Sequence, residues 1–178
     1  MLTIGRSKEY HTRSNTEVIQ EGEDVADRPG YVWDTYSPTP VMSTYLLAWV
    51  VSKYESAKNT SARGVKFEAF YSKASFMQHA ADIGAKMLDH FEQKVFGINY
   101  NLPKIDIVAV EMFSGAAMEN WGMMTFNTKY VLHSVNSLDT FDNDLTMAHE
   151  LVSHFFTNST HKGSHKTLGN VKVREHSE

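Results

Sequence analysis

Residues 146–156, TMAHELVSHFF, decide how this sequence is interpreted. Apolar residues recur there at helical spacing, so we expect an amphipathic helix. The same stretch carries His149, Glu150 and His154. Two imidazoles and a carboxylate are the side chains that bind zinc and activate water in hydrolases. The stretch therefore raises the question whether the three side chains can share one site.

The spacing of the two histidines differs from that of a zinc-binding helix. In the pattern His-Glu-x-x-His the histidines are four residues apart, about 400° of rotation, so both rings face one ion. Here His154 follows His149 by five residues, which leaves the rings roughly 140° apart, and Ser153 holds the motif position. A regular helix cannot bring these two rings to one Zn²⁺. The alternative is a local π-bulge, which absorbs one residue and would return His154 to the face of His149.

A second motif lies upstream, at residues 115–122, GAAMENWG. It resembles the exopeptidase motif Gly-Ala-Met-Glu-Asn, followed by Trp-Gly, of the aminopeptidase N family of zinc metallo-aminopeptidases, with Ala116 in the place of the glycine. Residues 40–48, 100–106 and 149–152 also resemble this family. The likeness covers about residues 14–158 and joins an exopeptidase motif to a downstream His-Glu helix.

The resemblance implies an α+β fold in two parts. Residues 1–57 would be the end of a β-rich N-terminal domain, and residues 63–178 the front of a thermolysin-like catalytic domain with a mixed sheet and helices. In that sheet we expect an edge strand near residues 118–126, with the helix of His149 packed behind. From about residue 158 the polar sequence predicts an irregular tail.

Periodicity and breakers place the other elements. We expect a buried strand at residues 41–52, a polar linker at 55–64, and strands at 65–71 and 104–110. Residues 75–96 predict one long helix, capped by Ser75 and ended by Gly97. Asp142 or Asn143 is expected to cap the helix of His149, and residues 118–132 favour extended structure.

The resemblance also implies roles for individual residues. Glu119 would accept hydrogen bonds from the free ammonium group of a peptide substrate, and the backbone of Ala116 and Ala117 would pair with the peptide as an added strand. Glu150 would act as the general base on zinc-bound water, with His149 as a zinc ligand. The implied substrate-binding residues are Ala116, Ala117, Met118, Glu119 and Asn120. His154 would be a further ligand only if the helix register shifts.

Three departures from the family pattern predict that this chain is catalytically impaired. Ser153 replaces the second histidine ligand, and a hydroxyl is a poor zinc ligand beside imidazole. Counting the family's spacing from Ser153 places Lys172 at the third ligand, a glutamate in the family, and Glu175 comes too late. The family's oxyanion-stabilising tyrosine, like its other domains, lies beyond the sequence given. We expect Zn²⁺ as the family cofactor, with binding by this chain in doubt.

Three functions stay open on the sequence alone. The chain is a zinc-dependent aminopeptidase by resemblance, impaired or inactive; or a non-catalytic module that binds peptide N-termini; or a truncated product without a function of its own. Met112, Met118, Met123 and Met124 could line a substrate pocket or fill the core. His161 and His165 stand four apart, but Gly163 between them favours a solvated tail over a metal site.

Composition narrows the classes of partner. The 178 residues carry a net charge of −4 and no basic cluster, which argues against nucleic acid as a partner. There is no cysteine, so disulfides and thiolate metal sites are excluded. The longest apolar run, residues 45–51, is too short to span a bilayer, and the first residues lack the apolar core of a signal peptide. The compartment stays unknown, and a peptide with a free N-terminus is the expected partner.

Overall fold

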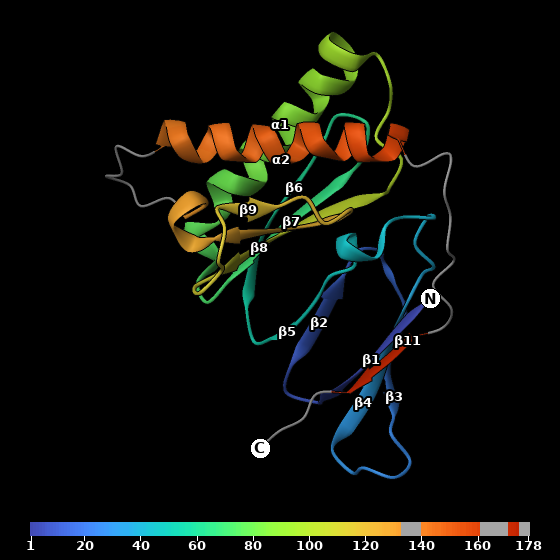
Figure 1. Ribbon diagram of the computed structural model, residues 1–178. Coiled ribbons are helices and arrows are strands. Elements are labelled where there is room, and N and C mark those ends of the chain that lie inside the picture. Colours follow the sequence, from blue (N-terminus) through green and yellow to red (C-terminus); the bar gives the residue numbers. More distant parts are fainter. Residues whose placement is uncertain (133–139, 161–170, 175–178) are drawn as a thin grey trace.

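The computed structural model describes residues 1–132, 140–160 and 171–174. Its larger sheet has five strands in the order β6-β7-β8-β10-β9 (Figure 1). The bounds are β6 Glu55–Thr60, β7 Lys66–Tyr71, β8 Lys104–Val110, β9 Ala117–Met118 and β10 Met123–Asn127. The β7–β8 and β8–β10 pairs are parallel, and the β6–β7 and β9–β10 pairs are antiparallel. The expected mixed sheet is therefore present. The single edge strand expected near residues 118–126 was wrong, because β9 alone lies at the edge and β10 lies between β8 and β9.

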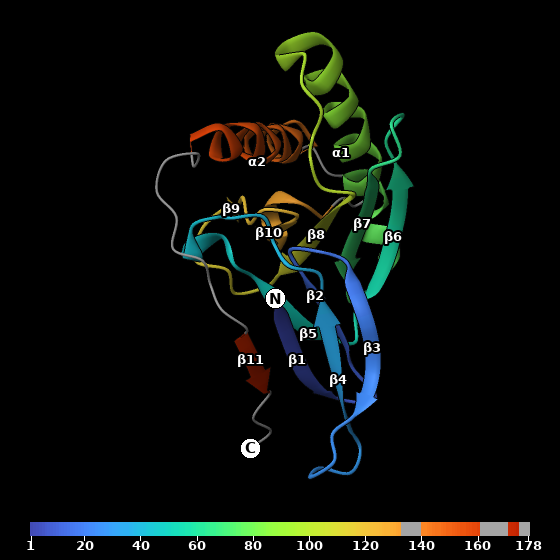
Figure 2. The ribbon, with the colours of Figure 1, turned by 90° about the vertical axis from the view of Figure 1, so that its right-hand side faces the viewer.

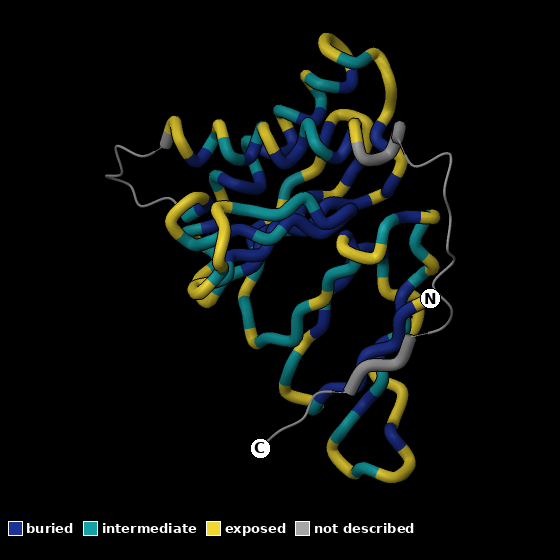
Figure 3. Tube along the Cα trace, in the orientation of Figure 1, coloured by how far each residue is buried: buried dark blue, intermediate teal, exposed yellow. Residues whose placement is uncertain are grey.

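Helices cover one face of this sheet. Helix α1 spans Gln78–His90 and helix α2 spans Thr140–Thr160. Alternate residues of the parallel strands, among them Phe67, Ile105 and Ile107, point toward these helices and form the main core with Leu88 and Leu151. Figure 3 shows this buried layer between the sheet and the helices. The opposite face carries a smaller apolar cluster, so the central strands are covered on both sides.

The N-terminal strands lie on the side of the sheet away from the helices (Figures 1 and 2). A four-stranded sheet has the order β11-β1-β4-β3, and β2 pairs with β5. The bounds are β1 Leu2–Ser7, β2 His11–Ser14, β3 Val18–Asp24, β4 Tyr31–Tyr36, β5 Trp49–Ser52 and β11 Val171–Arg174. The α+β class is confirmed. The division into domains at residues 57 and 63 stays a prediction.

Helix α1 is shorter than the single helix predicted for residues 75–96. A 3₁₀ turn, η2, covers Ala74–Phe76, and the α-helix begins only at Gln78, so Ser75 does not cap it. A π-helical segment, η3, covers Phe91–Phe96. The predicted end is confirmed, because Gly97 closes η3 with a left-handed φ of 65° that a residue without Cβ adopts freely.

Several local predictions were wrong. Residues 41–52 do not form one buried strand: η1, a 3₁₀ turn at Thr44–Leu46, precedes β5, and Val41 and Trp49 are exposed. The predicted linker contains β6, because its polar residues suit a sheet edge as well as a loop. Residues 128–130 of the predicted extended segment form η4, the 3₁₀ turn Thr128–Tyr130.

The C-terminal part of the chain also differs from the expectation. Helix α2 starts at Thr140, so Asp142 and Asn143 lie inside its first turn and do not cap it. Beyond residue 158 the helix continues to Thr160, and β11 pairs in parallel with β1, with Lys172 opposite Thr3. Residues 161–170 and 175–178 lie outside the described residues, as do 133–139. Among the described residues, no helix has both the length and the apolar character needed to cross a membrane.

Candidate functional site

Helix α2 is an α-helix over its whole length, and its two histidines lie in opposite environments. His149 is exposed to solvent, and His154 is completely buried. The π-bulge that could have returned His154 to the face of His149 is not formed. Ser153, one helical turn after His149, donates a hydrogen bond from Oγ to the His149 carbonyl oxygen at 3.0 Å.

His154 is part of the core beneath α2. Its ring stacks on Tyr100, with a centroid distance of 5.8 Å and an interplanar angle of 15°. Burial lowers the pKa of His154 to about 4, and the nearby backbone of Glu119 and Asn120 offsets this only in part. Within the described part of the chain, neither ring nitrogen makes a hydrogen bond of standard geometry, and the polar groups near the ring are the backbone of Glu119 and Asn120. The imidazole is therefore a neutral packing group.

Glu150 and Glu119 approach each other although they come from different motifs. Glu150 is 5% exposed, on the side of α2 that faces the sheet, and Glu119 is half-buried just after β9. Burial, with repulsion from the Glu119 carboxylate as the second cause, raises the pKa of Glu150 to about 7. Two carboxylates that repel each other favour a cation between them, since a cation relieves both desolvation and repulsion.

Among the residues that the structure describes, the edge strand β9 has a strand neighbour on one side only. Its Ala117 and Met118 pair with Phe126 and Thr125 of β10, and β9 is the last strand in the order of the sheet. The carbonyl oxygen of Ala116 accepts a hydrogen bond from the Asn127 amide at 2.9 Å, so it faces β10. The open side of β9 is therefore where an extended peptide could add as a strand.

Asn120 lies close to the other exopeptidase-motif residues but turns inward. It is buried, and its side-chain amide lies 3.4 Å from the Leu46 carbonyl oxygen as a donor. Its Oδ1 accepts a hydrogen bond from Thr125 Oγ1 at 3.1 Å. Met123 and Met124 are buried in the core, and Met112 is fully exposed. Of the four methionines, Met118 alone is placed to contact a peptide at β9.

The residues of α2 do not fit a zinc centre. Ser153 directs its hydroxyl to its own helix, and His154 lies in the core, which leaves His149 as the one imidazole available on the exposed side. Among the described residues, no three His, Asp or Glu side chains converge as metal ligands would. Lys172 lies in β11 beside β1, far from α2 (Figure 1). His161, His165 and Glu175 lie outside the described residues.

The mixed sheet, the exopeptidase motif at its edge and the His-Glu helix above it define a peptidase-type catalytic domain joined to a β-rich region. The chain belongs to peptidase family M1, whose domain model matches residues 79–162. Members of this family are zinc aminopeptidases.

Relatives of known activity support the assignment. The chain is similar to glutamyl aminopeptidase of Bos taurus, with 33% identity over 164 residues, 88% of this chain and 16% of that protein. It is 36% identical to endoplasmic reticulum aminopeptidase 2 of Bos taurus over 134 residues, 72% and 14% of the two chains. It is 31% identical to the human thyrotropin-releasing hormone-degrading ectoenzyme over 161 residues, 87% and 15%. The chain thus spans 14–16% of the length of these three relatives.

Sequence reasoning missed the residues that hold the exopeptidase motif in place. Asn15, Lys104 and Asp106 are buried polar residues around the turn after Glu119. A signal was present for two of them, because Lys104 and Asp106 stand two apart in a strand and therefore share one face. Asn15 gave no signal, since its partners are more than thirty residues away in sequence.

Proposed function

We propose that this chain is a catalytically impaired relative of the M1 aminopeptidases that recognises the free N-terminus of a peptide. The observation that carries the proposal is that Glu119 directly follows the edge strand β9 and interacts electrostatically with the buried Glu150 of α2. A peptide added along β9 would bring its terminal ammonium to Glu119. Two of the three relatives are aminopeptidases by name, and selection of a free amine is what distinguishes such enzymes from endopeptidases.

Charge supports an ammonium as the ligand. Glu150 is about half ionised at neutral pH because its pKa is raised to about 7. A cation placed between them would draw the remaining proton off Glu150 and gain a charge-assisted hydrogen bond. An acetylated terminus carries no charge and would leave the two carboxylates in repulsion.

The proposed impairment follows from the ligand set. Without a histidine at Ser153, His149 would have to hold Zn²⁺ with at most a carboxylate beside it, which is a weaker site than the family's three protein ligands. Glu150 could still accept a proton, but it would have no metal-activated water to act on. We therefore infer binding without efficient hydrolysis.

Binding is tested by calorimetric titration with a short free-amine peptide and its acetylated twin. We expect the free amine to bind more tightly, and we expect Glu119→Gln to abolish that difference. Equal affinity of the two peptides for the unmodified protein contradicts the proposal. Glu111→Gln, on an exposed carboxylate directly after β8, is the matched control and should leave the preference intact.

Hydrolysis is tested with an aminoacyl chromogenic substrate and added Zn²⁺. We expect release of the chromophore to stay near the rate of the uncatalysed reaction. Turnover that a chelator abolishes and fresh Zn²⁺ restores would show that impairment is the wrong inference, while leaving recognition of the amine untouched.

A further inference from the structure

The turn that follows Glu119 is held by residues of the N-terminal strands and of β8. Residues 120–122, here called the motif turn, lead from β9 into β10 and are closed by a hydrogen bond from the Met123 amide to the Asn120 carbonyl at 2.9 Å. Because Glu119 directly precedes the motif turn, the position of its carboxylate depends on how firmly that turn is held.

Asn15, directly after β2, joins the motif turn to the segment that leads from η1 into β5. It is 1% exposed. Its side-chain amide donates to the Trp121 carbonyl at 2.9 Å and to the Leu46 carbonyl at 2.8 Å. Its Oδ1 accepts a hydrogen bond from the Ala48 amide at 3.0 Å. Both amide protons and one lone pair of this buried side chain are therefore used to hold two backbone segments, residues 46–48 and the motif turn.

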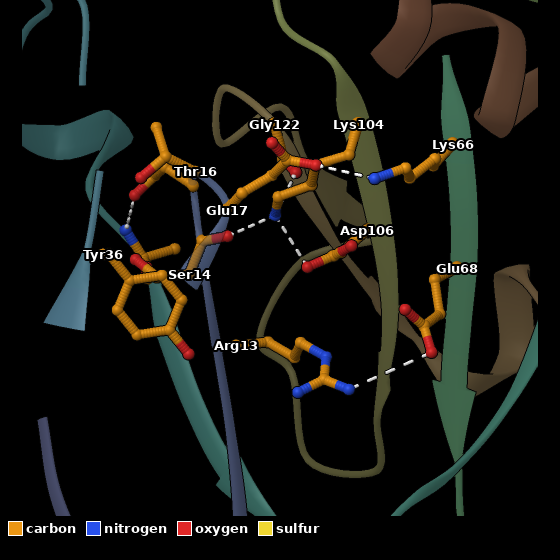
Figure 4. Close-up of polar contacts among 12 residues, drawn as sticks. Arg13, Ser14, Thr16, Glu17, Tyr36, Lys66, Glu68, Lys104, Asp106 and Gly122 are labelled. Carbon is orange, nitrogen blue, oxygen red and sulfur yellow. Dashed lines mark hydrogen bonds and ion pairs between the residues drawn. The ribbon is translucent and has the colours of Figure 1, made fainter. Parts of the chain in front are cut away.

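Lys104 holds the next residue of the motif turn. It lies on the face of β8 that points away from the helices, and its ammonium donates to the Gly122 carbonyl at 3.0 Å, to Asp106 at 2.7 Å and to the Ser14 carbonyl (Figure 4). The backbone amide of Asp106 donates to the same Gly122 carbonyl at 3.0 Å. The three protons of Lys104 are therefore all used within the protein.

Lys104 and Asp106 line a cleft, but Lys104 is not free to bind a ligand there. The cleft has a volume of about 430 Å³ and is walled by β2, β3, β7 and β8. Its other charged side chains include two mutual ion pairs, Lys66 with Glu17 at 2.9 Å and Arg13 with Glu68 at 3.9 Å (Figure 4). Lys104 is almost completely buried and has no proton left to offer into the cleft. Its partners are the backbone of β2 and of the motif turn.

We propose that Asn15 and Lys104 are positioning residues that fix the motif turn, and through it the Glu119 carboxylate, so that the N-terminal strands are a working part of the amine-recognition site. The link to amine recognition rests on the proposed function, whereas the fixing of the turn rests on geometry alone. A buried ion pair is weak support for stability, since apolar residues often replace it at no cost. The Lys104–Asp106 pair matters here for its geometry, because the ammonium of Lys104 and the backbone amide of Asp106 both donate to the Gly122 carbonyl.

The first readout needs no ligand. We expect Lys104→Met to speed amide hydrogen exchange at Met123, whose hydrogen bond closes the motif turn, by at least about tenfold relative to Ile107 of β8. Arg6→Met is the matched control, because Arg6 forms an equally buried pair with Asp34 in the other sheet. Exchange at Met123 that is unchanged by Lys104→Met, or raised equally by Arg6→Met, overturns the positioning role.

The second readout is the affinity ratio of the free-amine and acetylated peptides. Asn15→Asp keeps the shape and the acceptor for Ala48 but loses both donated hydrogen bonds. We expect it to reduce the ratio about tenfold or more, with Arg6→Met leaving the ratio unchanged at a comparable loss of stability. A ratio unchanged in both variants overturns the link to recognition. If the unmodified protein shows no preference for the free amine, the proposed function is overturned. Hydrogen exchange at Met123 then still decides whether the turn is held by these residues. If Lys104→Met does not fold, that exchange is measured in Asn15→Asp.

Discussion

Replacing Gly122 by alanine tests how tightly the motif turn is pressed against the N-terminal strands. A Cβ at this position would lie 2.1 Å from the carbonyl oxygen of Asn15, and the φ of Gly122 is +83°. Both the backbone conformation and the space oppose a side chain. Since this neighbouring oxygen belongs to the backbone, it cannot rotate away as a side chain would.

The magnitude follows from two separable contributions. An L-residue in the left-handed region costs about 1–2 kcal/mol. Forcing two backbone segments apart in a packed interior adds about 1–3 kcal/mol, so Gly122→Ala should cost about 2–5 kcal/mol of unfolding free energy in total. Gly97→Ala is the control, because Gly97 has a φ of +65° with no atom within 4 Å of the added Cβ. It carries the first contribution and lacks the second.

Both variants are compared with the unmodified protein by urea denaturation at fixed pH and salt. We expect the midpoint of Gly122→Ala to fall clearly below that of Gly97→Ala, and we expect exchange at Met123 to rise in the former alone. Equal midpoints for the two variants would refute the reasoning, because the contact between residues 15 and 122 would then contribute nothing beyond backbone strain.

Three further predictions concern the helix and the carboxylates. Ser153→His restores the four-residue spacing, so Zn²⁺ should raise the thermal midpoint of this variant more than that of the unmodified protein, and a chelator should reverse the gain; no gain would mean that spacing is not what limits zinc binding. The pKa of buried His154 is about 4 when folded, below the ordinary 6.5, so the unfolded chain binds the proton better and stability should fall as pH drops from about 6.5 toward 4, by up to about 3 kcal/mol. His154→Leu should flatten that part of the pH profile, and an unchanged profile would contradict the assignment of a neutral buried ring. Glu119→Gln should lower the pKa of Glu150 from about 7, measured by carboxyl carbon NMR, because repulsion is removed while burial remains; a pKa that stays at 7 would mean that the two carboxylates do not interact.

Local patterns predicted the elements that carry a strong short-range signal in their own residues. Strand β8 and the end of η3 at Gly97 were found because an apolar run and a left-handed glycine are short-range signals. The edge position of β9 came from resemblance to a family. The predicted caps at Ser75 and Asp142 failed because capping depends on where packing starts a helix, and packing started both helices at other residues.

The sequence by itself determined the α+β class, the family and the mismatch between His149 and His154, because five residues along any regular α-helix turn a side chain to another face. Only the tertiary structure decided what each face meets. It buried His154 against Tyr100, brought Glu119 to Glu150, and pressed Asn15 and Lys104 onto the motif turn. Those contacts join residues far apart in the chain, and their geometry depends on how whole sheets pack, which no short-range pattern contains.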